Sequence, residues 1–185
     1  MITAYLAGPD VFLPDAVAHA GRKIAICARY GIEGRAPLNE DLDALAAMDA
    51  NDAWWMIYRK DIEMMTACDI VIANLTPFRG ASADAGTLIE VGWFLGQGQP
   101  IFGYSNVADG FAARSRRQVE AVPDAMAGIA LEGFGLADNL MIEGAVTDGS
   151  GAGVMRPEPG RDLAFDSLEM FETCVAAASR RMAGR

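Results

Sequence analysis

The segment at 69–75, with the sequence DIVIANL, is the feature that most limits how this chain can fold. A near-continuous apolar run of this length is typical of a strand that is buried on both faces of a parallel sheet. A loop containing Gly and Pro follows at 76–83, an apolar helical pattern begins near Ala85, and another short apolar run spans 100–104. This order of strand, helix and strand predicts a parallel sheet with helices packed against it.

The other segments continue this alternation. Strands are predicted at 2–7 and 32–37, whereas the Gly- and Pro-rich stretch at 144–162 is expected to be a loop with at most a short strand. Helices are predicted at 15–30, at 51–67, at 85–96, at 111–130 with a break at Pro123, and at 166–181. We therefore predict that residues 1–185 form a single doubly wound α/β domain, with about five mostly parallel strands and helices on both faces.

The predicted first helix contains the only histidine and one of three cysteines. Its apolar residues recur at helical spacing and are expected to face the core: Val17, Ala20, Ile24 and Cys27 or Ala28. His19 is then assigned to the surface of this helix, where it is poorly placed for a zinc site or a Ser-His-Asp triad. The three cysteines lie far apart without CxxC spacing and are expected to be buried free thiols: Cys27, Cys68 and Cys174.

The formal net charge of -10 disfavours a nucleic-acid polymer as a partner, because backbone binding depends on Lys and Arg. No apolar run approaches the roughly 20 residues of a membrane helix, and the N-terminus has no basic segment before its apolar residues. A cytoplasmic protein that binds small molecules is therefore expected. The chain contains neither GxxxxGK[ST] nor GxGxxG, which disfavours nucleoside triphosphates and dinucleotides, and no metal site is predicted.

Three carboxylates are the candidates for chemistry. Glu90 is the only acid in the apolar run that begins near Ala85, and a buried carboxylate is unfavourable unless it is used. Asp84 precedes this helix and has an equally good interpretation as its N-cap. Asp61 shares one face of its helix with apolar residues, which indicates either a function or a buried hydrogen-bond partner. These apolar neighbours are Trp54, Ile57, Tyr58, Met64 and Met65.

Several carboxylates in a partly apolar crevice, without metal ligands or a phosphate loop, suit the cleavage of a glycosidic bond. One ionised carboxylate can attack the anomeric carbon or stabilise its positive charge. Another, kept protonated by desolvation or by its neighbour, can protonate the leaving group. The residue types alone lead no further than this reaction class.

Four segments resemble the nucleoside 2-deoxyribosyltransferases: YLAGPDVF at 5–12, ANLTPFRG at 73–80, DAGTLIEVG at 84–92 and DNLMI at 138–142. The resemblance implies a flavodoxin-like fold and the transfer of 2-deoxyribose between purine and/or pyrimidine bases. Transfer would proceed by two displacements through a covalent glycosyl-enzyme, with retention of configuration. The resemblance further implies no metal or organic cofactor, deoxynucleosides and free nucleobases as partners, and a homo-oligomer, dimeric or larger, with sites shared between subunits.

The same resemblance assigns roles to residues at matching positions. Glu90 matches the nucleophile that attacks C1′ of the deoxyribose, and Asp61 matches an acid that assists the departing and entering base. Asp84 matches a second acid near the base or sugar. Tyr5 matches a tyrosine that positions the nucleophile, and Asn139 matches an asparagine that reaches the sugar hydroxyls in a neighbouring subunit's site.

Five further residues in these segments are expected to bind the substrate. Phe12, Pro77 and Phe78 have the apolar surface needed to stack on a base, although loop packing explains them equally well. Gly8 and Gly86 belong to the same matched segments and allow close approach of a ligand to the backbone.

Two alternatives remain open. One is an N-glycoside hydrolase of the same superfamily, acting on 2-deoxynucleosides or nucleoside 5′-monophosphates, in which water resolves the glycosyl-enzyme. A phosphate is disfavoured because YLAGPDVFLPD at 5–15 offers acids and apolar groups. The other alternative is a non-catalytic nucleoside-binding module. Purine or pyrimidine preference depends on the loops at 9–15, 38–52 and 76–83 and is not predicted.

Overall fold

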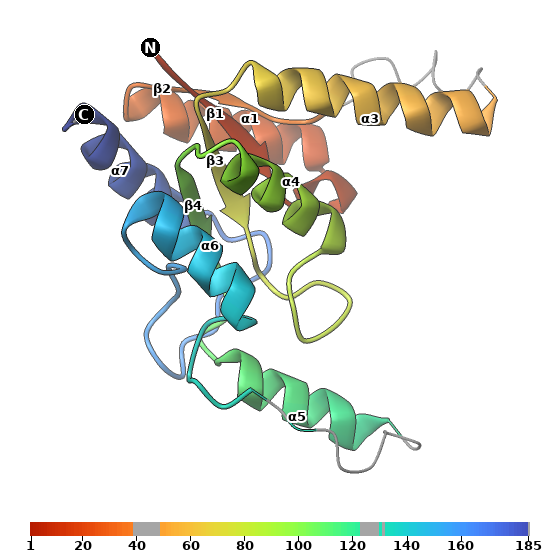
Figure 1. Cartoon of the computed structure of the whole chain (residues 1–185), viewed down its shortest axis with the longest axis vertical. Helices are drawn as coiled ribbons and strands as arrows, with labels where there is room; N and C mark the ends of the chain where they lie inside the picture. Colours follow the sequence, from red (N-terminus) through yellow and green to blue (C-terminus); the bar gives the residue numbers. More distant parts are fainter. Residues whose placement is uncertain (39–48, 123–129, 131, 185) are drawn as a thin grey trace.

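The structure is a computed structural model that describes residues 1–38, 49–122, 130 and 132–184 (Figure 1). Its centre is a parallel sheet in the order β2-β1-β3-β4. The strands are β1 (Ile2–Ala7), β2 (Ile32–Arg35), β3 (Ile70–Asn74) and β4 (Ile101–Tyr104). A parallel bridge between Tyr104 and Met155 extends the sheet beyond β4. The predicted doubly wound α/β fold is confirmed, and a single bridge stands where a fifth strand was expected.

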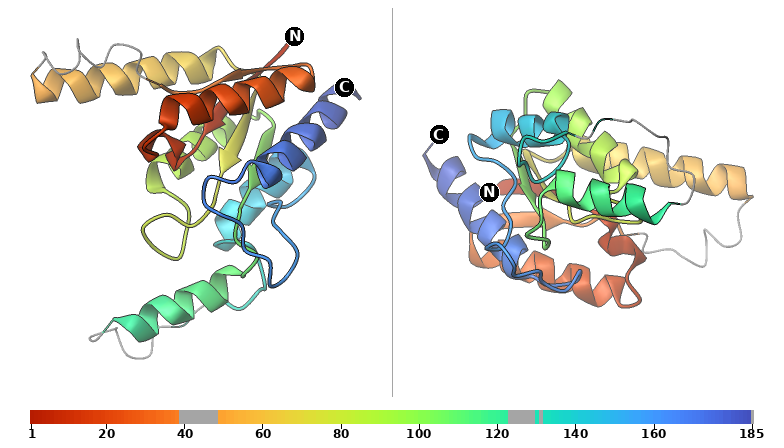
Figure 2. Two further views of the ribbon diagram at one scale, coloured as in Figure 1. Left: turned by 180° about the vertical axis from the view of Figure 1, so that it is seen from behind. Right: turned by 90° about the horizontal axis from the view of Figure 1, so that it is seen from below.

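Helices cover both faces of this sheet (Figures 1 and 2). One face is covered by α1 (Ala16–Arg29) and α7 (Glu169–Ala183). The other is covered by α4 (Ala85–Gly96), α6 (Leu140–Ser150) and the C-terminal part of α3 (Ala50–Thr66). The 3-10 helix η1 (Pro9–Phe12) follows β1, and α5 (Phe111–Ala121) lies beyond the carboxyl ends of the strands.

The central strand β3 explains why its sequence is almost uninterruptedly apolar. All five of its residues are buried. Ile70 and Ile72 pack on the side of α1 and α7, whereas Val71 and Ala73 pack on the side of α4 and α6. Because side chains alternate along a strand, a strand covered on both faces needs apolar residues at consecutive positions. The prediction from DIVIANL is therefore confirmed.

The predicted inward face of α1 is partly wrong. Val17 and Ile24 are exposed, and His19, which was assigned to the surface, is 1% exposed. Ala20 and Cys27 are buried as expected, and the three cysteines are buried free thiols. The helix is rotated so that Lys23 and His19 point inward, since both contact the buried Asp10 carboxylate.

The loop predicted at 144–162 is also partly wrong, because α6 continues to Ser150. Its glycines favoured a loop, but Gly149 has a packing reason. A Cβ atom at this position would lie 2.8 Å from the backbone nitrogen of Ile101, so only glycine lets α6 approach β4 this closely. The helix predicted at 111–130 ends at Ala121, and residues 123–129 and 131 lie outside the described part of the chain.

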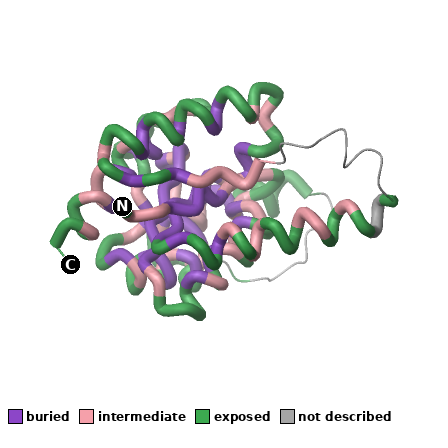
Figure 3. The backbone as a smooth tube through the Cα atoms, turned by 90° about the horizontal axis from the view of Figure 1, so that it is seen from above, coloured by how far each residue is buried: buried purple, intermediate pink, exposed green. Residues whose placement is uncertain are grey.

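The first half of α3 projects past the sheet, as the tube coloured by burial shows (Figure 3). Trp54 and Tyr58 are therefore 55% and 47% exposed, although the helical pattern predicted that they share a covered face with Asp61. Met65, near the end of the helix, is buried as expected. No helix within the described residues has both the length and the apolar character needed to cross a membrane.

A buried ion pair joins η1 to α1. The Asp10 carboxylate accepts hydrogen bonds from Lys23 Nζ at 2.7 Å and from Asn74 Nδ2 at 2.9 Å. Burial by itself would raise the pKa of Asp10, but the charge of Lys23 and the surrounding donors hold it well below its ordinary value. Lys23 Nζ also lies 4.7 Å from the centroid of the Phe171 ring. This pair fixes the segment that follows β1.

We expect Lys23→Met to lower the free energy of unfolding by about 3–5 kcal/mol, because it leaves the Asp10 carboxylate buried without its counter-charge. Urea denaturation at pH 7 measures this loss. Arg29→Met is the matched control: it removes the exposed pair with Glu172 and should cost less than about 1 kcal/mol. Equal losses in the two variants would contradict a special contribution of the buried pair.

Candidate active site

The centre of the candidate site is a hydrogen bond between β1 and α4. Tyr5 is fully buried in the middle of β1, and its hydroxyl donates to Glu90 Oε1 at 2.6 Å. Glu90 is half-buried in the second turn of α4, and its helix packs on the sheet through Val91 and Phe94. The structure thus brings together two of the residues that the sequence nominated.

The surroundings of Glu90 shift its ionisation towards neutral pH. Burial raises the pKa of Glu90 to about 7; the hydrogen bond from Tyr5 opposes this rise, while the charges of Asp61 and Asp84 add to it. Burial, followed by the charge of Glu90, raises the pKa of Tyr5 far above its ordinary value. Tyr5 therefore remains a donor, and its bond favours the ionised form of Glu90.

Asp61 lies in the part of α3 that approaches this pair. It is half-buried, and burial raises its pKa to about 6. Its negative charge acts on both Tyr5 and Glu90. Within the described residues its carboxylate accepts no hydrogen bond, so the structure does not supply the buried partner that would make Asp61 a purely structural acid.

Asp84 begins α4 and caps it. Its Oδ2 accepts hydrogen bonds from Thr87 N at 3.1 Å and from Thr87 Oγ1 at 3.3 Å, which confirms the capping interpretation. The same carboxylate is close enough to raise the pKa of Glu90. Gly86 is exposed in the first turn beside it, where a Cβ atom would lie 3.0 Å from Asp84 Oδ2.

Aromatic rings come together where the loops after β1 and β3 meet. Phe12 stacks on Phe78 with a distance of 5.5 Å between centroids, and the Arg79 guanidinium lies 4.9 Å and 4.6 Å from these two rings. Phe12 is 59% exposed, and Pro77 is half-buried in the same loop. The rings pack on each other, which supports the interpretation as loop packing, and stacking on a base stays a prediction.

The local packing and backbone conformation explain why residue 8 is glycine. Its φ is +152°, and a Cβ atom there would lie 2.7 Å from Cβ of Asn74 and 2.9 Å from Asp10 Oδ2. Only glycine fits this close approach between the ends of β1 and β3. A contact between Gly8 and substrate stays a prediction.

Asn139 is engaged within its own chain. It is the N-cap of α6, where its Oδ1 accepts from Met141 N at 3.0 Å and its Nδ2 donates to Glu132 Oε1 at 2.5 Å. Both polar atoms of the Asn139 side chain are therefore occupied within its own chain, and a role in a neighbouring site stays a prediction. To reach a sugar in another subunit, its amide would have to exchange the bond with Glu132 for one with the ligand.

A cavity of about 550 Å³ lies between α5 and the loop that precedes α4. Its lining is mostly apolar and includes Phe78, Ala83, Phe111 and Val119, with Gln118 among the polar groups. None of the three carboxylates lines it. The cavity is therefore separate from the carboxylate cluster.

Tyr5 from β1, Asp61 from α3, and Asp84 and Glu90 from α4 thus make up the candidate site. A profile of the nucleoside 2-deoxyribosyltransferase family matches residues 4–141, which is well over half of the chain. The chain belongs to this family.

Solved structures related to this nucleoside 2-deoxyribosyltransferase family member agree with the fold. A 2-desoxiribosyltransferase from Leishmania mexicana is 28% identical with a TM-score of 0.68, and the match covers 97% of this chain and 98% of that one. A conserved protein from Enterococcus faecalis V583, 21% identical with a TM-score of 0.52, matches over 95% of this chain and 97% of its own, and shows the fold alone.

One curated relative matches a smaller part of this chain. It is an uncharacterized protein of Schizosaccharomyces pombe, 33% identical over 102 residues. The match covers 55% of this chain and 48% of the relative, so the chain spans about half the length of this curated relative.

Sequence reasoning missed the polar residues that support the site. The spacing of Lys23 could have indicated its burial, since it lies three residues after Ala20 and four before Cys27 on the buried face of α1. Arg114 had no such signal and Asp138 had only its place at the start of DNLMI, because their contacts are with the distant loop that precedes α4.

Proposed function

We propose that this protein is a nucleoside 2-deoxyribosyltransferase with Glu90 as its nucleophile. The observation that carries the proposal is the 2.6 Å hydrogen bond from Tyr5 to Glu90, beside two further carboxylates. The bond holds one carboxylate oxygen and leaves the other for attack. A half-buried, oriented carboxylate beside a second acid is an arrangement that suits retaining glycosyl transfer.

In the first step, Glu90 attacks C1′ of the deoxyribose and the N-glycosidic bond breaks. The electron pair of that bond passes to the base nitrogen, which takes a proton from Asp61. In the second step, an incoming base gives its proton to Asp61 and attacks C1′, which releases Glu90. Two inversions at C1′ give overall retention.

Both acids titrate near neutral pH, the range in which proton transfer is effective. Because the pKa of Glu90 is the higher of the two, the reactive form, with Glu90 ionised and Asp61 protonated, is the less populated of the two singly protonated forms. A pKa of about 6 for Asp61 suits a group that gives and takes a proton near neutral pH. Glu90 must be ionised to attack, and the Tyr5 hydroxyl favours that form against the effect of burial. The absent 2′-hydroxyl of deoxyribose eases the formation of positive charge at C1′.

Tyr5→Phe is expected to lower the plateau of the pH–rate profile and to move its upper midpoint to higher pH. The Tyr5 hydrogen bond lowers the pKa of Glu90, so its loss raises a pKa that already stands at about 7, and less nucleophile is ionised at any given pH. Transfer rates measured from pH 5 to 9 test this. An upper midpoint that stays unchanged would contradict it.

The function itself is tested by incubating a deoxynucleoside with and without a second free base and separating the products. Transfer predicts that an exchanged nucleoside forms with the β configuration retained, and that base release is slow without an acceptor. Base release that is equally fast without acceptor, with no exchanged nucleoside, would identify a hydrolase instead. A panel of purine and pyrimidine acceptors would define the base preference.

The outer face of α4 supports an oligomer. Ile89 is 71% exposed there, and Cβ atoms at Gly92 and Gly96 would meet nothing within 4 Å in a single chain. An apolar helix face of this kind is typical of a subunit interface. We propose a homo-oligomer in which Asn139 serves a neighbouring site, and a fully active monomer in sedimentation at assay concentration would contradict it.

A further inference from the structure

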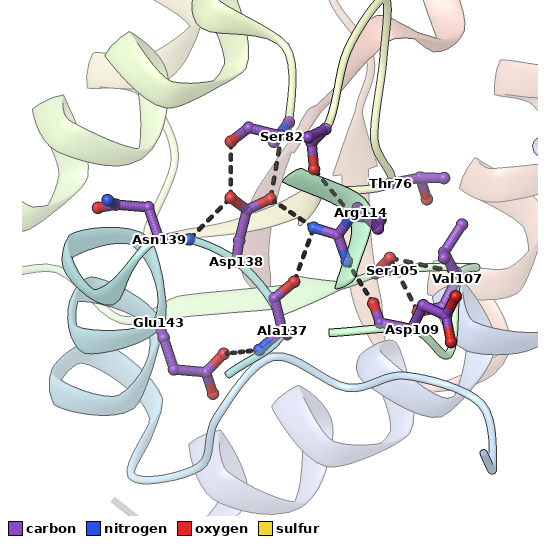
Figure 4. A network of polar contacts seen from close by, with 12 residues as sticks. Thr76, Ser82, Ser105, Val107, Asp109, Arg114, Ala137, Asp138, Asn139 and Glu143 are labelled. Carbon is purple, nitrogen blue, oxygen red and sulfur yellow. Dashed lines mark hydrogen bonds and ion pairs between the residues drawn. The ribbon is translucent and has the colours of Figure 1, made fainter. Parts of the chain in front are cut away.

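A polar network outside the carboxylate cluster joins α5, the loop before α4 and the segment before α6 (Figure 4). At its centre Arg114 Nη2 lies 3.3 Å from Asp138 Oδ2. The two side chains are 6% and 2% exposed, respectively. Asp138 is the first residue of the DNLMI segment, and the proposed chemistry gives it no role.

Every position around the Asp138 carboxylate is occupied by a donor. Oδ1 accepts from Ser82 Oγ at 2.6 Å and from Asn139 N at 2.8 Å. Oδ2 accepts from Ala83 N at 3.2 Å in addition to Arg114. One buried carboxylate therefore binds two consecutive residues of the loop before α4 and the first residue of the α6 cap.

Arg114 binds the same loop from the other direction. Its Nε donates to Ala81 O at 2.8 Å, its Nη2 donates to Ala137 O at 2.8 Å, and its Nη1 donates to Asp109 O. The guanidinium thus spans three backbone segments with a planar set of donors, a geometry that lysine cannot reproduce. Residues 81–83 are fixed by side chains from two distant parts of the chain.

These contacts end immediately before Asp84. Asp84 starts α4 and determines where the helix that carries Glu90 begins. A buried ion pair contributes little to stability compared with apolar packing of the same volume, but its directional bonds define position. The network therefore fixes the position of residues 81–83 through directional bonds, which apolar packing does not provide.

We propose that Asp138 and Arg114 are positioning residues that hold residues 81–83, and through them Asp84 and the start of α4, in the geometry needed for glycosyl transfer. This inference rests on the proposed function. The same carboxylate fixes the backbone of Asn139, so one clamp sets the position of two residues proposed to contact substrate.

The test uses Ser82→Ala, which removes one bond to Asp138 and leaves the ion pair intact, together with Asp138→Asn. Ser150→Ala is the matched control, because it removes a buried hydroxyl at the far end of α6 that bonds Val146 O and Ala152 O. We expect Ser82→Ala to lower kcat about tenfold with the donor KM changed less than about twofold, since small misplacements of reacting groups affect the transition state most. Asp138→Asn should lower kcat further.

Hydrogen–deuterium exchange gives a second measurement that does not depend on activity. We expect faster exchange over residues 81–87 in Ser82→Ala and Asp138→Asn, and unchanged exchange there in Ser150→Ala. An unchanged kcat in both clamp variants, or an equal loss in Ser150→Ala, would overturn the inference. If the wild-type protein transfers no deoxyribose, the proposed function fails on its own, and unchanged exchange over 81–87 then overturns the clamp.

Discussion

Glu90→Gln is expected to reduce deoxyribosyl transfer by roughly 10⁴-fold or more and to leave the protein folded. The amide has the shape of the carboxylate and still accepts the hydrogen bond from Tyr5, but it cannot form the ester with C1′. Transfer is followed by product separation, and intact-mass analysis should show a deoxyribosyl adduct in the wild-type protein and none in the variant. Glu63→Gln, an exposed acid of α3, is the control and should keep its rate.

The same substitution should stabilise the protein at alkaline pH. Burial raises the pKa of Glu90 from 4.5 to about 7, so the folded state binds more protons than the unfolded state between these values. Stability is then lost as pH rises through this window. Removing the charge removes that loss, so urea denaturation at pH 8 should find Glu90→Gln more stable than the wild type. A variant that is active, or inactive because it is unfolded, would contradict the assignment.

The residues that could be predicted from sequence are those whose signal is local. The run in β3 identifies a strand with two covered faces because each of its residues is apolar. Glu90 stands out because an acid in an apolar helix is unfavourable wherever that helix packs. For both, the neighbouring sequence already contains the physical reason for the structure.

What could not be predicted depends on contacts between distant segments. The inward rotation of α1 follows from the pairing of Lys23 with Asp10, and no periodicity reveals that partner. Gly149 favoured the prediction of a loop. Its actual role is to let α6 pack closely against β4, and that role depends on tertiary structure. Arg114 resembles any surface arginine until the loop before α4 is placed against it. Tyr5 and Asn139 were nominated by family resemblance alone.

Asp61→Asn is expected to lower the transfer rate by about 10²–10⁴-fold with natural deoxynucleosides, while the substrate still binds. The proposed role of Asp61 is to protonate the departing base, and an amide cannot supply that proton. A donor whose leaving group departs without protonation, such as 4-nitrophenyl 2-deoxyriboside, should lose much less rate in the first step. The ratio of the two losses therefore separates acid catalysis from a general disturbance of the site.

The pH dependence provides the corresponding check. With a pKa of about 6, Asp61 is the group whose deprotonation should form the basic limb of the first step, and Asp61→Asn should abolish that limb. Because the negative charge of Asp61 also raises the pKa of Glu90, the single limb left in this variant should follow the ionisation of Glu90, with a midpoint below about 7. Unchanged kinetics with both donors would show that Asp61 is only a half-buried acid of α3, and an equal loss with both would assign it to the support of Glu90 and Tyr5 instead of the base.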